Sequence, residues 1–214
     1  MTIRTIVADD HPAVRLGVRA ALERTPRARF CVSAEADTAT ALLNLLKQAP
    51  CDFLVTDFRM PEHDKPDALG LLRQLRASYP RLPILVLTMV DNPMVLRGLS
   101  NIGIRGLYDK QDCLSGLGQA SYNLLRGATY MSPRFVTRLQ EYEADHWGGN
   151  EALSTRELAV LKLLVSGMSG RDVATRLNRS EKTISRQKRC AMEKLGISHD
   201  TALMEYAAMV GLPA

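Results

Sequence analysis

The stretch Ile6-Val7-Ala8-Asp9-Asp10 joins a short apolar run to two adjacent carboxylates. The pattern returns along the chain: further runs of β-forming residues end at Asp57, at Thr88 and, through Gly106-Leu107-Tyr108, close to Lys110. Because amphipathic helical stretches separate these runs, the alternation predicts a parallel sheet with crossover helices. The carboxyl ends of parallel strands gather at one edge, where such folds bind ligands. We therefore expect these polar side chains to form one site.

The residue types at this edge are typical of phosphoryl chemistry with a magnesium ion. Crowded carboxylates repel one another unless a cation neutralises them, and oxygen-only ligands favour Mg²⁺. A hydroxyl and an ammonium can bind the peripheral oxygens of an incoming phosphoryl group. Taken alone, Asp9-Asp10 could simply end a strand and Lys110 could be a surface charge. Only the joint pattern indicates a site.

Three segments follow from the patterning of the chain. Residues 1–127 contain five βα units, which indicates the α/β class and a five-stranded, doubly wound (βα)5 domain. Residues 128–150 break the alternation and are interpreted as a linker, with a short helix to about Tyr142 and a hinge at Gly148-Gly149-Asn150. Residues 151–214 read as a small all-α domain of four helices. We expect the five strands near residues 6–8, 30–32, 53–56, 84–88 and 105–108.

Serines mark the starts of the helices in the last segment. Ser154 and Glu157 form a capping-box pattern, and Ser169 and Ser180 can cap the next two helices. A fourth helix is expected from about Asp200 to Met209. Its apolar residues could form a dimer contact or simply pack in the core of the domain, and the sequence leaves both open; they are Leu203, Tyr206, Ala207 and Val210.

The helix after Ser180 has an apolar side and a basic side. Its neighbourhood, residues 171–194, holds eight basic and three acidic residues. Together with the preceding short helix it forms a helix-turn-helix pattern, which predicts binding to double-stranded DNA in the major groove. The long side chains of Arg186 and Arg189 suit hydrogen bonds to base edges, whereas lysines suit contacts with phosphates. Ser185 suits both kinds of contact. The expected DNA contacts are Lys182, Thr183, Ser185, Arg186, Lys188, Arg189 and Lys194.

The whole-chain composition sets wider limits. The chain of 214 residues is 46% hydrophobic and 24% charged, and no apolar run approaches the roughly 20 residues of a membrane helix. The start of the chain lacks the apolar stretch of a signal peptide. We therefore expect a cytoplasmic protein without membrane contact. Its four scattered cysteines are expected to stay reduced.

The N-terminal motifs resemble those of response-regulator receiver domains. Asp9-Asp10-His11-Pro12, Thr56-Asp57 with Met60-Pro61, Leu87-Thr88 and Tyr108-Asp109-Lys110 stand in the order of that family. The C-terminal part resembles the LuxR-type helix-turn-helix of the NarL/FixJ family, through Leu153 to Glu157, Gly167-Met168-Ser169, Thr183-Ile184 and Lys194 to Ile197. Within that family the chain is similar to the capsule-synthesis regulator of the Rcs phosphorelay. The similarity lies in Thr88-Met89, Asn92-Pro93 and Lys182 to Ser185.

The resemblance implies a role for each residue of the predicted site. Asp57 is the expected phosphoacceptor, and Thr88 and Lys110 are expected to bind the transferred phosphoryl group. Magnesium is expected on Asp9, Asp10, Asp57 and the backbone carbonyl of Arg59. His11 is interpreted as structural.

The resemblance also implies partners for the chain, and it leaves more than one function possible. We expect a histidine kinase or phosphotransfer protein as phosphodonor, a homodimer on DNA, and transcription regulation gated by phosphorylation. The alternative is a regulator controlled mainly by heterodimerisation with an auxiliary partner, independent of phosphorylation. An aspartyl-phosphate enzyme would need a D-x-D start or a G-x-x-x-x-G-K-[ST] loop, and neither occurs. We therefore expect no enzyme.

Two departures from the receiver pattern bear on signalling. Leu107 stands where most receivers place an aromatic residue whose rotation reports phosphorylation, and the neighbouring Tyr108 should face the opposite side of the sheet. Aromatic switching is therefore not expected, and output is expected to rely on Thr88 and the helix after it. The loop after Met60-Pro61 is also longer than usual.

Overall fold

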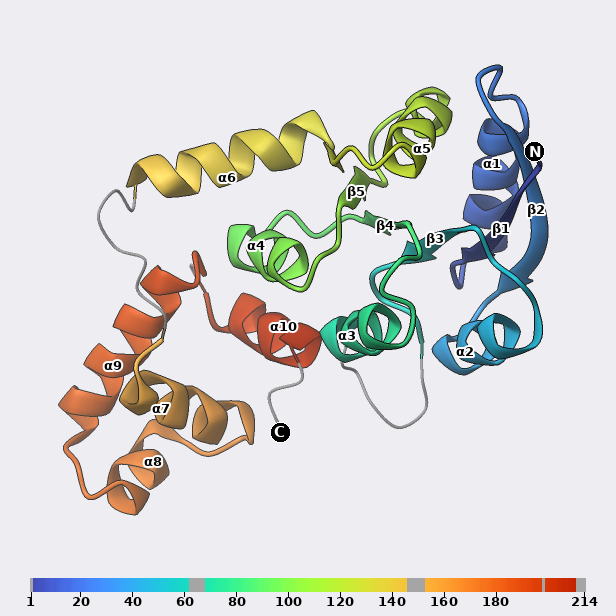
Figure 1. Cartoon of the computed structure of the whole chain (residues 1–214). Coiled ribbons are helices and arrows are strands. Elements are labelled where there is room, and N and C mark those ends of the chain that lie inside the picture. Colours follow the sequence, from blue (N-terminus) through green and yellow to red (C-terminus); the bar gives the residue numbers. More distant parts are fainter. Residues whose placement is uncertain (1, 62–67, 146–152, 198, 211–214) are drawn as a thin grey trace.

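The chain folds into an N-terminal α/β domain and a C-terminal helical domain (Figure 1). The computed structural model describes residues 2–61, 68–145, 153–197 and 199–210. The predicted hinge at Gly148-Gly149-Asn150 and the long loop after Met60-Pro61 lie outside these residues. Among the described helices, none combines the length and the apolar character that crossing a membrane requires.

One parallel sheet forms the centre of the N-terminal domain. The strand order is β2-β1-β3-β4-β5-β6. The chain therefore begins with β1, places β2 beside it at one edge, and then adds β3 to β6 in turn on the other side of β1. This order is that of a doubly wound fold and confirms the predicted class. The strands are β1 (Thr2–Ala8), β2 (Arg29–Ala36), β3 (Phe53–Asp57), β4 (Ile84–Thr88), β5 (Gly106–Asp109) and β6 (Tyr130–Met131).

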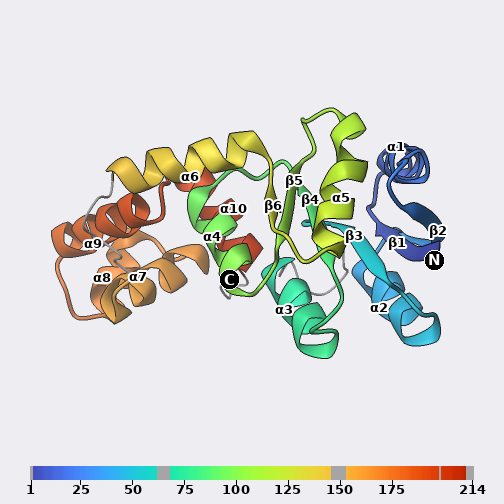
Figure 2. The same cartoon turned by 45° about the horizontal axis from the view of Figure 1, so that its top comes forward.

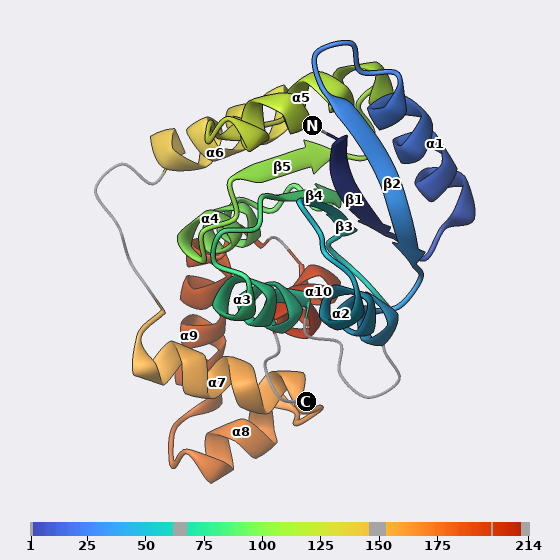
Figure 3. The ribbon, with the colours of Figure 1, turned by 45° about the vertical axis from the view of Figure 1, so that its right-hand side comes forward.

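Helices cover both faces of the sheet because successive strand residues point to opposite sides. On one face Ile6, Leu54 and Val86 pack against α2 (Ala39–Gln48), α3 (Ala68–Ser78) and α4 (Pro93–Asn101). On the other face, their strand neighbours pack against α1 (Pro12–Glu23) and α5 (Leu117–Leu125), which follows the short 3₁₀ helix η1 (Leu114–Gly116). Figures 2 and 3 show the two helical layers on either side of the sheet.

The segment interpreted as a linker adds structure to the N-terminal domain. β6 pairs in parallel with β5, Leu107 opposite Met131, and forms a sixth strand that the sequence pattern did not predict. The helix α6 (Pro133–Asp145) follows at once and runs three residues beyond the predicted end at Tyr142. Its Phe135 is fully buried among residues of the N-terminal core. The first part of the segment therefore completes the sheet, and α6 packs against α4.

The C-terminal domain has the four predicted helices with the predicted caps. Ser154 and Glu157 form the capping box of α7, Ser169 and Asp172 form another at α8, and the Ser180 hydroxyl accepts from the Thr183 amide at α9. The helices are α7 (Thr155–Val165), α8 (Gly170–Arg176), α9 (Glu181–Lys194) and α10 (Asp200–Val210).

The helix α10 lies between the two domains (Figure 1). Its Leu203 and Ala207 are buried, and Leu203 packs with Leu161 and Leu195 of its own domain. Tyr206 also packs against the N-terminal core, and α10 contacts α3. Of the two interpretations left open for this helix, core packing describes the monomer.

Candidate functional site

Three charged side chains meet at the carboxyl ends of β1, β3 and β5, as predicted. The Nζ atom of Lys110 lies 2.7 Å from Oδ2 of Asp9 and 3.0 Å from Oδ2 of Asp57. The Asp9 side chain is fully buried and the Asp57 side chain is 9% exposed. A single ammonium therefore holds two carboxylates side by side, which leaves the cluster with a net negative charge.

The electrostatics of this cluster are set by burial and by Lys110. Burial raises the pKa of Asp57, and the charge of Lys110 opposes that rise without cancelling it. Burial lowers the pKa of Lys110, but its contacts with Asp9 and Asp57 outweigh burial, so the Lys110 pKa is raised and the ammonium stays charged. Asp57 is thus a carboxylate with one open side and a fixed cation beside it.

The remaining predicted residues surround this cluster. Asp10 is 37% exposed at the mouth of the site, and its Oδ1 lies 2.6 Å from Nδ1 of His11. Asp9, Asp10 and His11 each offer a ligand atom within 4.8 Å of the others. The buried Thr88 hydroxyl accepts a hydrogen bond from the Val90 amide at 3.0 Å. Asp10, His11 and Thr88 line one cleft of about 780 Å³, together with Asp57, Arg59 and Lys110.

The two residues before Asp109 face opposite sides of β5, as the strand periodicity predicts. Leu107 packs in the core under α3 and α4, and Tyr108 packs in the core under α1 and α5. The Tyr108 hydroxyl donates to the Cys113 carbonyl at 2.7 Å, and its ring stacks on Tyr130. Tyr108 is therefore held away from the Thr88 side and cannot replace the missing aromatic residue at position 107.

Sequence reasoning missed an ionic cluster next to this site. Arg134 of α6 reaches the buried Asp109, which directly precedes Lys110, and also reaches Asp91, three residues after Thr88. The sequence carries no signal for it, because the pattern of residues 128–150 indicates a linker and does not show which carboxylates Arg134 would face.

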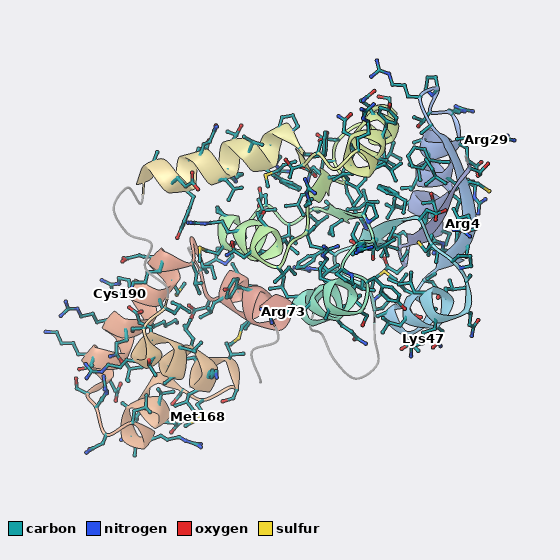
Figure 4. The ribbon with its side chains drawn as sticks, in the orientation of Figure 1. Arg4, Arg29, Lys47, Arg73, Met168 and Cys190 are labelled. Carbon is teal, nitrogen blue, oxygen red and sulfur yellow. The ribbon has the colours of Figure 1, made fainter. Side chains whose placement is uncertain are left out.

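The helix α9 presents the predicted polar face to solvent. Ile184 and Ala191 are buried, whereas Lys182, Ser185, Arg186 and Arg189 are exposed. Figure 4 shows nitrogen-tipped side chains extending from α8 and α9 on the side away from the N-terminal domain, with Cys190 marking α9. The N-terminal domain covers α10 and leaves this face of α9 open.

Three of the expected DNA contacts have partners within the domain. Lys188 Nζ lies 2.6 Å from Asp200, and Lys194 Nζ lies 3.0 Å from Glu157. The amide of Thr183 donates to the cap residue Ser180. Burial raises the pKa of Glu157, but hydrogen bonds from Ser154 and Lys194 outweigh it and the pKa is lowered. Lys194 therefore stabilises the α7–α9 packing from the end of α9.

Family models match both domains. Residues 5–115 match the response regulator receiver domain, and residues 151–207 match the luxR family of bacterial regulatory proteins. The transcriptional regulatory protein RcsB of Escherichia coli strain K12 is 37% identical over 210 residues, which cover 98% of this chain and 96% of the relative. The chain belongs to the RcsB-like, LuxR-type response regulators. RcsB of Salmonella typhi is 38% identical over 207 residues, 97% of this chain and 94% of the relative.

Solved structures of the same family share the whole fold of this response regulator. One is described as two RcsB dimers bound to two parallel DNAs, with a TM-score of 0.82 at 34% identity over 98% of this chain and all of that one. Another is Salmonella RcsB bound to a promoter in the presence of the phosphomimetic BeF₃⁻, with a TM-score of 0.84 at 34% identity over 96% of this chain and 98% of that one.

Proposed function

We propose that this response regulator binds double-stranded DNA through α9 and that phosphorylation of Asp57 gates its action on transcription. One combination of features supports the proposal most directly. A buried carboxylate beside a fixed ammonium, suited to accept a phosphoryl group, shares a chain with an exposed basic helix. Relatives that match nearly the full length are DNA-binding regulators, and one was solved with a phosphomimetic.

The acceptor chemistry follows from the geometry around Asp57. A carboxylate oxygen of Asp57 attacks phosphorus in a phosphohistidine of a kinase or phosphotransfer protein. The new O–P bond forms as the P–N bond breaks, and the electron pair of the P–N bond goes to the imidazole nitrogen of the donor. The Lys110 ammonium lies 3.0 Å from the Asp57 carboxylate and can form an ion pair with one phosphoryl oxygen after the transfer. The Thr88 hydroxyl can donate a hydrogen bond to a second phosphoryl oxygen.

The donor set fits a hard cation. Carboxylates of Asp9, Asp10 and Asp57, with the Arg59 carbonyl, supply the oxygen ligands that Mg²⁺ prefers, and the half-exposed Asp10 can act partly through water. When bound, Mg²⁺ neutralises negative charge as the phosphoryl group arrives. The chain itself contributes the negative cluster that attracts the ion and the Lys110 ammonium that keeps Asp9 and Asp57 in place.

The output surface is the open face of α9. Arg186 and Arg189 are proposed to read base edges, and Lys182 to contact phosphate. Lys188 is paired with Asp200 and Lys194 with Glu157. Each lysine can contact a DNA phosphate only if its ammonium binds both groups at once or breaks its ion pair. Two copies of the chain would place two such helices on half-sites about 10 base pairs apart or a multiple of that.

The test compares wild type with Asp57→Asn. Each protein is incubated with a small phosphodonor and Mg²⁺, its mass is measured, and genome-wide DNA occupancy is recorded in cells. We expect a one-phosphate mass increase in the wild type alone, and we expect promoter occupancy to depend on it. Normal occupancy and regulation by Asp57→Asn would refute phosphate gating and favour control by a heterodimer partner.

A further inference from the structure

Four side chains tie the helix α6 to the edge of the sheet beside the acceptor. The Nη2 atom of Arg134 donates to Oδ2 of Asp91 at 2.8 Å, and its Nη1 atom lies 3.2 Å from Oδ2 of Asp109. Arg138, one turn later, donates from Nε to the same oxygen of Asp91 at 3.3 Å. We call Asp91, Asp109, Arg134 and Arg138 the α6 clamp.

The burial of Asp109 makes the clamp more than a surface ion pair. Exposed ion pairs contribute little, whereas a buried carboxylate needs a partner to offset its lost hydration. The Asp109 side chain is fully buried, while that of Arg134 is 40% exposed. The fork of the guanidinium lets Arg134 serve Asp109 and Asp91 with different nitrogens. Arg134 thus connects a fixed point at the end of β5 with the loop after β4.

The residue directly before that loop, the last of β4, carries the hydroxyl expected to bind the phosphoryl group. The Thr88 hydroxyl accepts from the Val90 amide at 3.0 Å, one residue before Asp91. A hydroxyl can accept this hydrogen bond and donate its own hydrogen at the same time. The bond therefore links any movement of the Thr88 oxygen toward a phosphoryl oxygen to the Val90–Asp91 backbone. A change at Thr88 therefore reaches the clamp within three residues.

Both ends of the connection continue to the end of α9. The Asn92 side chain, next to Asp91, caps α4 and donates from Nδ2 to the Leu195 carbonyl at 3.3 Å. Tyr142 of α6 donates from its hydroxyl to the Lys194 carbonyl. The loop after β4 and the helix α6 therefore bind two successive carbonyl groups at the C-terminal end of α9, the helix proposed to read DNA.

We propose that the α6 clamp positions α6 and the end of α9 in the unphosphorylated protein, and that phosphorylation loosens it through Thr88. This inference rests on the proposed function. Arg134, Arg138 and Asp91 are positioning residues, since none of them is among the groups proposed to bind the phosphoryl group or DNA. The clamp supplies a route from Thr88 to α9 that needs no aromatic side chain at position 107.

The decisive variants are Arg134→Gln and Asp91→Asn in the full-length protein. Arg126→Gln is the matched control, because it removes the same charge from an arginine whose side chain donates to Tyr122 of the helix directly before it, α5. Hydrogen exchange of amides in α6 and in residues 193–197 is measured without phosphorylation. DNA affinity is then measured with and without Mg²⁺ and BeF₃⁻, a mimic of the phosphoryl group, on a duplex taken from an occupied promoter.

We expect both clamp variants to exchange these amides faster than wild type and Arg126→Gln. We also expect the ratio of DNA affinities with and without BeF₃⁻ to fall at least about fivefold, the low end of coupling between allosteric sites. A purely structural role would leave that ratio unchanged. The proposal would be refuted if the amides of both variants exchanged hydrogen at the wild-type rate. It would also be refuted if both variants kept the wild-type ratio of DNA affinities with and without BeF₃⁻.

The two readouts separate this inference from the proposed function. If BeF₃⁻ leaves the DNA affinity of wild type unchanged, phosphate gating fails, whereas the exchange measurement still judges whether the clamp holds α6. If BeF₃⁻ changes the wild-type affinity and both clamp variants respond equally, gating stands and the clamp is refuted.

Discussion

The lysines of α9 differ in whether their ammonium groups form an ion pair within the protein. This difference predicts different effects of replacing them with alanine. Lys182 is exposed, and no residue in the described part of the chain forms an ion pair with it. Lys194 is 21% exposed, with its ammonium 3.0 Å from Glu157. We therefore predict that Lys182→Ala removes a DNA phosphate contact, whereas Lys194→Ala removes an interaction inside the domain.

The magnitude follows from counterion release. Each phosphate that a protein neutralises contributes about −0.9 to the slope of log K against log salt concentration on duplex DNA. Lys182→Ala should make the slope shallower by about 0.9 for one bound copy and about 1.8 for a dimer in which both copies contact phosphate. Lys194→Ala should leave the slope nearly unchanged and instead lower the stability of the helical domain.

Fluorescence anisotropy with a random-sequence duplex at several salt concentrations measures these slopes. The duplex needs no known target site, because non-specific binding is essentially electrostatic. Thermal unfolding of the same variants reports the loss of the Lys194–Glu157 pair. An equal change of slope in the two variants would refute the reasoning, since it would mean that Lys194 leaves Glu157 for DNA.

Three further predictions concern stability. Hydrogen bonds from Arg4 hold the pKa of Asp52 at about 2, below its ordinary 3.8, so this pair stabilises the fold above pH 3.8 and loses its effect as the pH falls through about 2. Acid unfolding of Asp52→Asn should lack that component. Ser154→Ala removes the cap of α7 and should cost about 1 kcal/mol in thermal unfolding, whereas retained stability would show that Glu157 suffices. Phe135→Ala should cost about 3–5 kcal/mol in urea unfolding of the N-terminal domain, and a loss below 1 kcal/mol would contradict its place in that core.

The arrangement of the acceptor site could be predicted because strand ends converge by geometry. Asp9, Asp57, Thr88 and Lys110 each follow an apolar run, and parallel strands bring such positions to one edge whatever the loops do. The helix caps at Ser154, Ser169 and Ser180 were predictable for a similar reason. A cap depends on neighbours within three residues, so local sequence contains the whole interaction.

The parts that escaped prediction depend on distant partners. β6 is only two residues long, and nothing in Tyr130-Met131 indicates pairing with β5, 24 residues earlier. The α6 clamp joins Arg134 to Asp91 across 43 residues, and Lys194 meets Glu157 across 37. Charge and amphipathicity place such residues on a helix face, but they do not name the carboxylate that lies opposite.

The two-residue strand β6 has a consequence for where this chain can be divided. The Ser132 amide donates to the Leu107 carbonyl at 3.0 Å, and the Ser132 hydroxyl accepts from the Asp109 amide at 2.9 Å. A fragment that ends at residue 127 would leave those backbone groups of β5 without these partners and expose a bare sheet edge. Bare edges pair with other chains and promote aggregation. A fragment meant to stay monomeric therefore has to extend past Phe135.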